Sequence, residues 1–272
     1  DLVAEVREQV MVDAVIAGML EGDRLEVGGS GAQAYADAVA TYLALGVSRT
    51  ADYCNALCTW HTTGEKITHL FTRQAIPMTW EIAETNVFSD SSGNFMGQLA
   101  WVVKALAAAS ASVSGKVDQI SAETVAYNDL VISTDPPYYD NIGYSDLSDF
   151  FYVWLRRCLH EIQSQAVSTM LTPKVDELVA NPYRHDGKNG AERFFVEGFN
   201  SVFRKIRKGA NTCVPIAVYY AYKQRDAAAD GTSSTGWHTL LSGLIEAGWE
   251  ITATWPMRSE LANRMLSQGT NA

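Results

Sequence analysis

Apolar positions in the first hundred-odd residues recur at three- and four-residue spacing, which is the period of an amphipathic helix. Residues 32–45 and 48–60 follow this pattern and are rich in good helix formers, and residues 94–109 repeat it. Small residues interrupt the pattern at 110–115. The sequence therefore predicts a mainly helical region over residues 1–115.

Beyond residue 115, short apolar runs alternate with helical patterns. Strands are predicted at residues 129–133, 213–222 and 249–255, and helices at 147–162, 191–208 and 235–247. The polar residues 164–190, between the first two of these helices, are predicted to form a long loop. The order strand, helix, strand, helix, strand is typical of a mainly parallel α/β sheet with crossover helices. We therefore assign residues 116–272 to a second, α/β region.

The sequence Asp135-Pro136-Pro137-Tyr138 follows the first predicted strand with only Thr134 between them. In parallel α/β sheets, ligands bind at the carboxyl ends of the strands. The lone pair of an exocyclic amine on a nucleic-acid base is delocalised into the ring, which makes the nitrogen a poor nucleophile. Two acceptors on its two N–H bonds would draw the nitrogen toward tetrahedral geometry. The Asp135 carboxylate and the Pro136 carbonyl suit this task.

The rest of the motif fits the same chemistry. The prolines fix the backbone and remove N–H groups that would compete for the acceptors. Tyr138 can stack on a base extruded from its helix. Because the amine is neutral, its alignment matters more than the tuning of a pKa. The alternative is a proline-stiffened turn with an incidental Asp and Tyr, but the place of the motif after a strand favours the functional interpretation.

Residues 131–157 (VISTDPPYYDNIGYSDLSDFFYVWLRR) closely resemble a family of large adenine-specific DNA methylases that usually also carry a zinc ribbon. Further stretches similar to the same family are residues 73–78 with Trp80, 86–94, 178–185 and 254–258. The resemblance implies that Asp135, Pro136 and Tyr138 hold the target adenine, that S-adenosylmethionine donates the methyl group and that DNA is the partner. It also implies a Rossmann-like methyltransferase sheet, which is incomplete here because its seventh strand would follow residue 272.

A methyltransferase of this type needs a glycine-rich turn after its first strand, where the backbone approaches the cofactor. Residues 28–31 (GGSG) are the one candidate, but the strand pattern before them is short, and a turn that leads a helix explains them better. In the family, the cofactor loop and the zinc ribbon lie upstream of the matched part. We therefore expect the main cofactor loop in a missing N-terminal part of the same polypeptide, with Asp135 adjacent to the cofactor.

Further substrate contacts are predicted near the motif and in the polar loop. The residues that could line the base pocket are Tyr139, Asp140 and Asn141, with Trp255 and Arg258 at the border of the same cleft. The residues that could contact phosphate or form a lid over the base are Lys174, Asn181, Arg184, His185 and Lys188. Ordinary packing and solvent exposure are the alternatives for both sets.

The four cysteines are too few for a disulfide scaffold, so a reducing, cytoplasmic setting fits best. Cys54, Cys58 and His61 fall on one face of the helix predicted at 48–60. Because that helix is otherwise apolar, small buried cysteines are the preferred interpretation, and no metal site is predicted. No apolar run approaches the roughly 18 residues of a membrane span, so none is predicted.

The net charge of −10 argues against a nucleic-acid partner until its distribution is considered. Residues 1–150 carry 7 Lys and Arg against 20 Asp and Glu, whereas residues 151–210 carry 10 against 6. This basic stretch directly follows the motif and is compatible with a phosphate-facing surface. The four basic side chains within residues 204–208 equally suit the dipole of a helix end, which is their preferred interpretation.

The sequence thus predicts a DNA adenine N6-methyltransferase fragment that passes a methyl group directly to a flipped base, with no covalent intermediate and no catalytic metal. Cytosine N4 and guanine N2 of RNA are the nearest alternative targets, and glutamine in proteins is more remote. From another class, the isolated chain could be an inactive, non-catalytic module that binds nucleic acid. The chain does not begin with Met and stops without a charged tail, which favours a piece of a longer protein.

Overall fold

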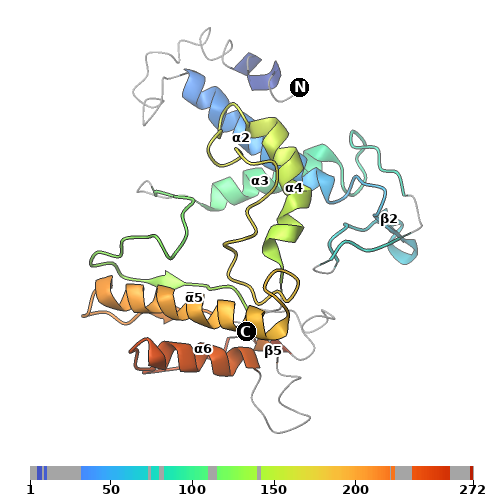
Figure 1. Cartoon of the computed structure of the whole chain (residues 1–272). Coiled ribbons are helices and arrows are strands. Elements are labelled where there is room, and N and C mark those ends of the chain that lie inside the picture. Colours follow the sequence, from blue (N-terminus) through green and yellow to red (C-terminus); the bar gives the residue numbers. More distant parts are fainter. Residues whose placement is uncertain are drawn as a thin grey trace. The chain divides into compact units, whose positions relative to one another are not determined.

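The computed structural model describes residues 5–7, 9–10, 32–72, 75–79, 83–109, 115–139, 142–220, 222–223, 235–257 and 270–271. Within these residues it is a mixed α/β structure with three short, two-stranded sheets (Figure 1). The mixed α/β class predicted from the sequence is therefore confirmed. The chain divides into two compact units: unit 1 comprises Asp1–Val117 and Ser145–Thr172, and unit 2 comprises Asp118–Tyr144 and Pro173–Ala272. The first division lies close to the predicted one after residue 115, whereas the second segment of unit 1 comes from within the predicted α/β region.

In the part of the chain that the structure describes, three long helices and a small antiparallel hairpin make up most of unit 1. The helices are α2 (Ala32–Ala51), α3 (Phe95–Ala108) and α4 (Tyr144–Leu159), and the hairpin is β1 (Trp60–His61), the 3-10 helix η3 (Thr62–Gly64) and β2 (Lys66–Ile67). Ala36, Ala40 and Ala44 recur at every fourth position of α2 and are at most 1% exposed. They form a narrow buried stripe of small side chains. Helix α2 packs against α3, with Gly46 next to Phe95 and Leu99. Only the first residue of α4, Tyr144, belongs to unit 2.

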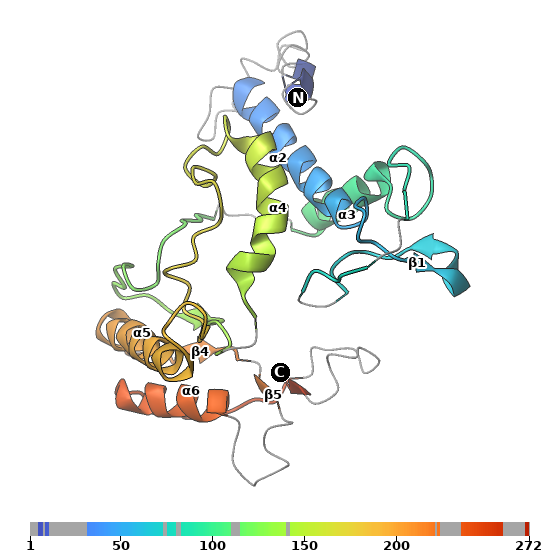
Figure 2. The same ribbon diagram turned by 45° about the vertical axis from the view of Figure 1, so that its right-hand side comes forward.

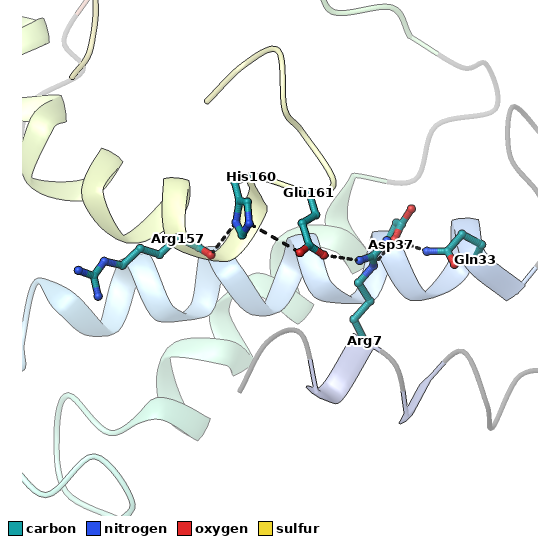
Figure 3. Close-up of polar contacts among 6 residues, drawn as sticks. All are labelled: Arg7, Gln33, Asp37, Arg157, His160 and Glu161. Atoms are coloured by element: carbon teal, nitrogen blue, oxygen red, sulfur yellow. Dashed lines mark hydrogen bonds and ion pairs between the residues drawn. The ribbon is translucent and has the colours of Figure 1, made fainter. Parts of the chain in front are cut away.

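Arg7 links three segments of unit 1 (Figure 3). Its Nε donates to Asp37 Oδ1 of α2 at 2.6 Å, and its Nη1 donates to Glu161 Oε2, just after α4, at 3.1 Å. Gln33 donates to the same Asp37 oxygen at 2.9 Å, and His160 Nε2 lies 3.7 Å from Glu161 Oε1. The two carboxylates thus tie the first described residues of the chain to α2 and to the end of α4.

Helix α2 ends at Ala51, before the end of the helix predicted at residues 48–60, because Asp52 forms hydrogen bonds with a later segment of the chain. The Asp52 carbonyl accepts the N–H of Leu70 at 2.7 Å, and its Oδ1 accepts the N–H of Phe71 at 3.1 Å. Residues 52–57 therefore form turns and bends, and the helix predicted at 48–60 is wrong beyond Ala51.

The predicted helix face of Cys54, Cys58 and His61 does not form, because the chain leaves the helix before these residues. Cys58 is fully buried and its Sγ donates to the Asp52 carbonyl at 3.4 Å, as expected of a small core side chain. His61 lies in the exposed strand β1. In the described part of the chain, no three His, Cys, Asp or Glu side chains gather in a way that could hold a metal ion.

Unit 2 has an aromatic core between two helices and a parallel pair of strands. Its elements are β3 (Ser133–Thr134), α5 (Lys188–Gly209), β4 (Ala217–Val218) and α6 (Thr235–Glu246), with a further antiparallel pair, β5 (Tyr222–Lys223) and β6 (Thr270–Asn271). Helices α5 and α6 run side by side in Figures 1 and 2. Phe195, Phe199 and Phe203 recur at every fourth position of α5 and are at most 2% exposed. Their successive ring centroids are 5.7 and 4.4 Å apart, and Leu240 and Leu244 of α6 complete the core.

Strands β3 and β4 are paired in parallel, with Ser133 opposite Ala217 and Thr134 opposite Val218. The N–H of Tyr219, directly after β4, donates to the Thr134 carbonyl at 2.8 Å. The predicted parallel pairing of the first two strands is confirmed, although both strands are shorter than predicted.

The third strand, predicted at residues 249–255, is wrong, because these residues form no strand. Trp249 instead forms hydrogen bonds with helices α5 and α6. Its backbone N–H donates to the Leu244 carbonyl and its indole N–H donates to the Phe203 carbonyl, both at 3.0 Å. The segment after it is exposed, and Trp255 at its end is 83% exposed.

The described residues cover only one face of the β3–β4 pair. Ile132 and Val218 pack against the core of α5 and α6. On the other face, Val131 is 67% exposed and Tyr219 is 49% exposed. Parallel sheets are normally covered on both faces, so the second face of this pair lacks its usual cover within the described residues.

Gly243 of α6 lies against α5, and a Cβ placed on it would be 2.8 Å from Asn200 Oδ1 and 3.0 Å from Phe199 Cδ1. We expect Gly243→Ala to lower the free energy of unfolding by about 1–2 kcal/mol, because overpacking outweighs the gain in helix propensity. Denaturant unfolding of the chain measures this. The control is Gly115→Ala, where a Cβ would meet no atom within 4 Å, so its effect should be under about 0.5 kcal/mol. A stabilised Gly243→Ala would contradict the close contact of α5 and α6.

Candidate active site

The motif lies at the carboxyl end of β3, because Asp135 directly follows Thr134, the last residue of that strand. Strand β4 runs parallel to β3 and ends at Val218. The carboxyl ends of parallel strands meet at one edge of a sheet, so the residues after Val218 lie next to the motif. Asp135 is exposed there, and the three residues after it are half-buried.

The Tyr138 hydroxyl donates a hydrogen bond to Asp135 Oδ1 at 2.9 Å. Burial, and then this hydrogen bond, raise the pKa of Tyr138 from its ordinary value of 10.0 to about 12. The phenol is therefore protonated at neutral pH and can act as a donor. In the free chain, the carboxylate that the motif offers to an amine already accepts one internal hydrogen bond.

Two aromatic residues that sequence reasoning missed lie beside the motif. The Tyr220 ring is 5.4 Å from the Tyr138 ring at an interplanar angle of 78°, which is an edge-to-face contact. Tyr144 is near enough that, after burial, the charges of Asp135 and Glu177 raise its pKa. Tyr220 lies inside the strand predicted at residues 213–222, so the sequence did not place it beside the motif. Tyr144 had no signal in the sequence either.

Tyr139 lies in the core of unit 2, unlike its predicted place in an open base pocket. It is 8% exposed, its ring meets the Phe195 ring edge-on at 5.2 Å, and its carbonyl accepts the Ala180 N–H at 2.8 Å. Its φ of +23° lies in a region that few residues other than glycine adopt. This turn of the backbone lets Tyr138 reach the carboxylate while the next side chain anchors the motif in the core.

Two residues of the polar loop are engaged within the loop itself. Arg184 Nη1 lies 2.8 Å from Glu177 Oε2 and 3.4 Å from the Lys174 carbonyl oxygen, and the two paired side chains are 19% and 12% exposed. Asn181 Oδ1 accepts the Tyr183 N–H at 2.9 Å. These contacts shape the loop, so they differ from the phosphate contacts predicted for Arg184 and Asn181.

The remaining predicted residues are more scattered. Lys188 is exposed at the first position of α5, and Lys174 is half-buried in the loop. His185 stacks on Phe194 with ring centroids 3.8 Å apart. The structure thus gathers Lys174 with Arg184 and leaves Lys188 on the surface. Predicted residues that lie outside the described part of the chain are 28–31, Asp140, Asn141 and Arg258.

Two open concavities lie along the carboxyl-terminal half of α5, away from the motif residues. One, of about 510 Å³, is lined by Glu197, Asn200, Ser201, Arg204, Lys205 and Lys208. The other, of about 680 Å³, is lined by residues 125–129, Lys205, Lys208, residues 209–210 and Thr212. Arg207 is bound within the unit, since its Nε donates to the Gly248 carbonyl at 3.2 Å and its guanidinium lies 5.5 Å from the Trp249 ring centroid. Neither Asp135, which is exposed, nor Tyr138, which is half-buried, lines either concavity.

Comparisons of the chain with models of protein families, with curated proteins and with solved structures find no match. None of the helices in the described part of the chain combines the length and the apolar character needed to cross a membrane. What the chain does must therefore be inferred from the motif, its place at the end of a strand and its neighbours.

Asp135→Asn removes the negative charge that opposes ionisation of the phenol, so the pKa of Tyr138 should fall from about 12 part of the way toward 10. A ¹³C NMR titration of ring-labelled tyrosines measures this, with Tyr138→Phe to assign the resonance. Because folding raises this pKa, the resulting stabilisation is complete below pH 10 and is lost as the pH rises through about 12. An unchanged pKa in Asp135→Asn would contradict the contact.

Proposed function

We propose that this chain carries the catalytic DPPY part of a DNA adenine N6-methyltransferase, which transfers a methyl group directly to a flipped base. The observation that carries the proposal is Asp135-Pro136-Pro137-Tyr138 at the carboxyl end of a parallel strand, with the carboxylate exposed and a phenol beside it. The resemblance of residues 131–157 to adenine-specific DNA methylases supports adenine as the base.

In the proposed reaction, the motif prepares the amine as a nucleophile. The Asp135 carboxylate and the Pro136 carbonyl each accept one N–H of the amino group, which draws the nitrogen out of conjugation with the ring. The nitrogen would then form a bond to the methyl carbon as the bond from that carbon to the donor's sulfonium sulfur breaks. The donor would leave as a neutral thioether, and one N–H proton would leave toward the carboxylate or solvent. No side chain has to act as a covalent nucleophile in this scheme.

Binding of the base requires an exchange of hydrogen bonds at the carboxylate. In the free chain, the Tyr138 hydroxyl donates to Asp135 Oδ1 at 2.9 Å. The incoming amine replaces that donor, so one hydrogen bond is lost and another is formed, with a small net cost. The phenol ring, which remains beside the carboxylate, can then stack on the face of the base.

S-adenosylmethionine is the proposed methyl donor and supplies the methyl group as an electrophile. Within the described residues, no glycine-rich turn between a strand and a helix is present to cradle it, and residues 28–31 lie outside them. The residues that the structure does describe therefore act on the base side of the reaction. They bind the base, orient its amine and accept its N–H groups.

The proposed fold is an incomplete Rossmann-like sheet. It is supported by the parallel pairing of β3 and β4 and by the packing of one face of the pair on α5 and α6. The other face exposes Val131 and Tyr219. We propose that a further part of the same polypeptide covers this face and brings the main cofactor loop.

Other planar amines fit the same geometry, so cytosine N4 and guanine N2 of RNA are alternative targets. A different class is a non-catalytic module that binds nucleic acid through the motif. The lack of a cofactor turn within the described residues favours this second candidate for the isolated chain.

Asp135→Ala in the intact polypeptide should reduce methylation of adenine in duplex DNA by about 100-fold or more, because it removes the acceptor that the amine needs. Transfer of a radiolabelled methyl group, followed by identification of the modified nucleoside, measures both rate and target. Asp176→Ala, at an exposed position of the loop, is the matched control and should leave the rate unchanged. Undiminished methylation by Asp135→Ala would overturn the proposed function.

Calorimetry of the isolated chain with S-adenosylmethionine tests where the cofactor site lies. We expect no saturable heat of binding, because the described residues supply the base side alone. The intact polypeptide, titrated in the same way, is the positive control. Tight binding by the isolated chain would show that these 272 residues contain the cofactor site.

A further inference from the structure

The end of β4 places a second aromatic side chain against the motif. Tyr220 lies two residues after Val218, and its ring meets the Tyr138 ring edge-to-face at 5.4 Å. We propose that Tyr220 is a positioning residue of the base site: it holds the Tyr138 ring beside Asp135 in an orientation that can stack on a planar, amine-bearing base. This inference rests on the proposed function and adds to it a residue from a different strand.

Tyr220 is itself held firmly, as a positioning residue must be. The preceding residue is fixed by the ladder, since the Tyr219 N–H donates to the Thr134 carbonyl at 2.8 Å. The Tyr220 hydroxyl donates to the Gly236 carbonyl in the first turn of α6 at 3.4 Å, and its ring lies 6.4 Å from that of Trp237. Backbone, hydroxyl and ring are therefore each restrained by a neighbouring element.

Gly236 permits this arrangement by bringing the backbone of α6 close to both tyrosines. A Cβ placed on Gly236 would lie 3.2 Å from the Tyr220 hydroxyl oxygen and 3.4 Å from Tyr139 Cβ. The same turn of α6 thus contacts Tyr220, which supports the Tyr138 ring, and Tyr139, which anchors the motif in the core. The orientation of Tyr138 is controlled from the end of β4 and from α6 together.

The geometry of the two rings suits a stacking platform. At an interplanar angle of 78°, Tyr220 restrains the tilt of the Tyr138 ring but does not take the parallel position that a stacked base needs. Tyr138 is half-buried, so one part of its ring packs against the protein while another part remains accessible. A planar base beside Asp135 can then use the accessible part.

Tyr219, which like Tyr220 lies just after β4, provides a matched comparison. It is adjacent in sequence and 49% exposed on the opposite face of the β3–β4 pair. In the described part of the chain it makes no ring contact like that of Tyr220. Because both side chains lie just after β4, a difference between the two variants in the pKa of Tyr138 reports the contact of Tyr220 with Tyr138.

The test compares Tyr220→Leu, Tyr220→Phe and Tyr219→Leu in the intact polypeptide. For each variant, kcat and KM for DNA methylation are measured, together with the pKa of Tyr138 by ¹³C NMR of ring-labelled tyrosine. We expect Tyr220→Leu to lower kcat/KM by about 2- to 10-fold, the range for loss of one aromatic pair, and to lower the pKa of Tyr138 from about 12. Tyr220→Phe keeps the ring and should retain most of the activity, and Tyr219→Leu should leave the pKa of Tyr138 unchanged.

Two results would overturn the inference in distinguishable ways. If Tyr220→Leu changes neither kcat/KM nor the pKa of Tyr138 while Asp135→Ala abolishes methylation, Tyr220 has no positioning role and the proposed function stands. If Asp135→Ala methylates as well as the unaltered protein, the base site itself is wrong and the inference falls with it.

Discussion

The parallel ladder between β3 and β4 is the constraint on which the candidate site depends. The hydrogen bond from the Tyr219 N–H to the Thr134 carbonyl fixes the relative positions of two strand ends that are more than eighty residues apart in sequence. It brings Asp135 and Tyr220 to the same edge. Ile132, just before β3, and Val218 of β4 pack against the core cluster that contains the phenylalanines of α5. This packing supports one face of the ladder. The chemistry of the motif is local, but its surroundings are set by this long-range pairing.

Helix positions were largely predictable because their signals are local. Helix α3 begins after Asn94, whose side-chain oxygen accepts the Gly97 N–H at 2.7 Å, and α6 ends just before Gly248, whose φ is +88°. The end of α2 was not predictable in this way, because Asp52 turns away to bond a segment almost twenty residues further along. The strand predicted at residues 249–255 was wrong for a related reason. The backbone and indole N–H groups of Trp249 donate to carbonyls of α6 and α5, and an apolar run in the sequence does not reveal such partners.

The residues of the candidate site also differ in whether the local sequence or a long-range contact determines their position. The motif and its place after a strand could be found from sequence, since both are properties of ten consecutive residues. Tyr220 could be found only once the strands were paired. From sequence, Arg184 could contact phosphate, belong to a lid over the base or simply face solvent in a polar loop. Its side chain is instead largely buried beside Glu177 and is part of the loop's own structure. Tyr139 was placed in the pocket for its nearness to the motif, whereas its backbone turns it into the core.

The internal hydrogen bond at Asp135 bears on how a reaction cycle would end. An unmodified amino group has two N–H donors to offer to the carboxylate and the proline carbonyl, whereas a singly methylated one has a single donor left. The Tyr138 hydroxyl, three residues away in the chain, can again donate to Asp135 Oδ1 when the amine leaves that oxygen. In the proposed reaction, the product is therefore the weaker competitor for the same oxygen, and closure of the phenol onto the carboxylate would help to expel it. A contact that opposes entry of the substrate would in this way promote turnover.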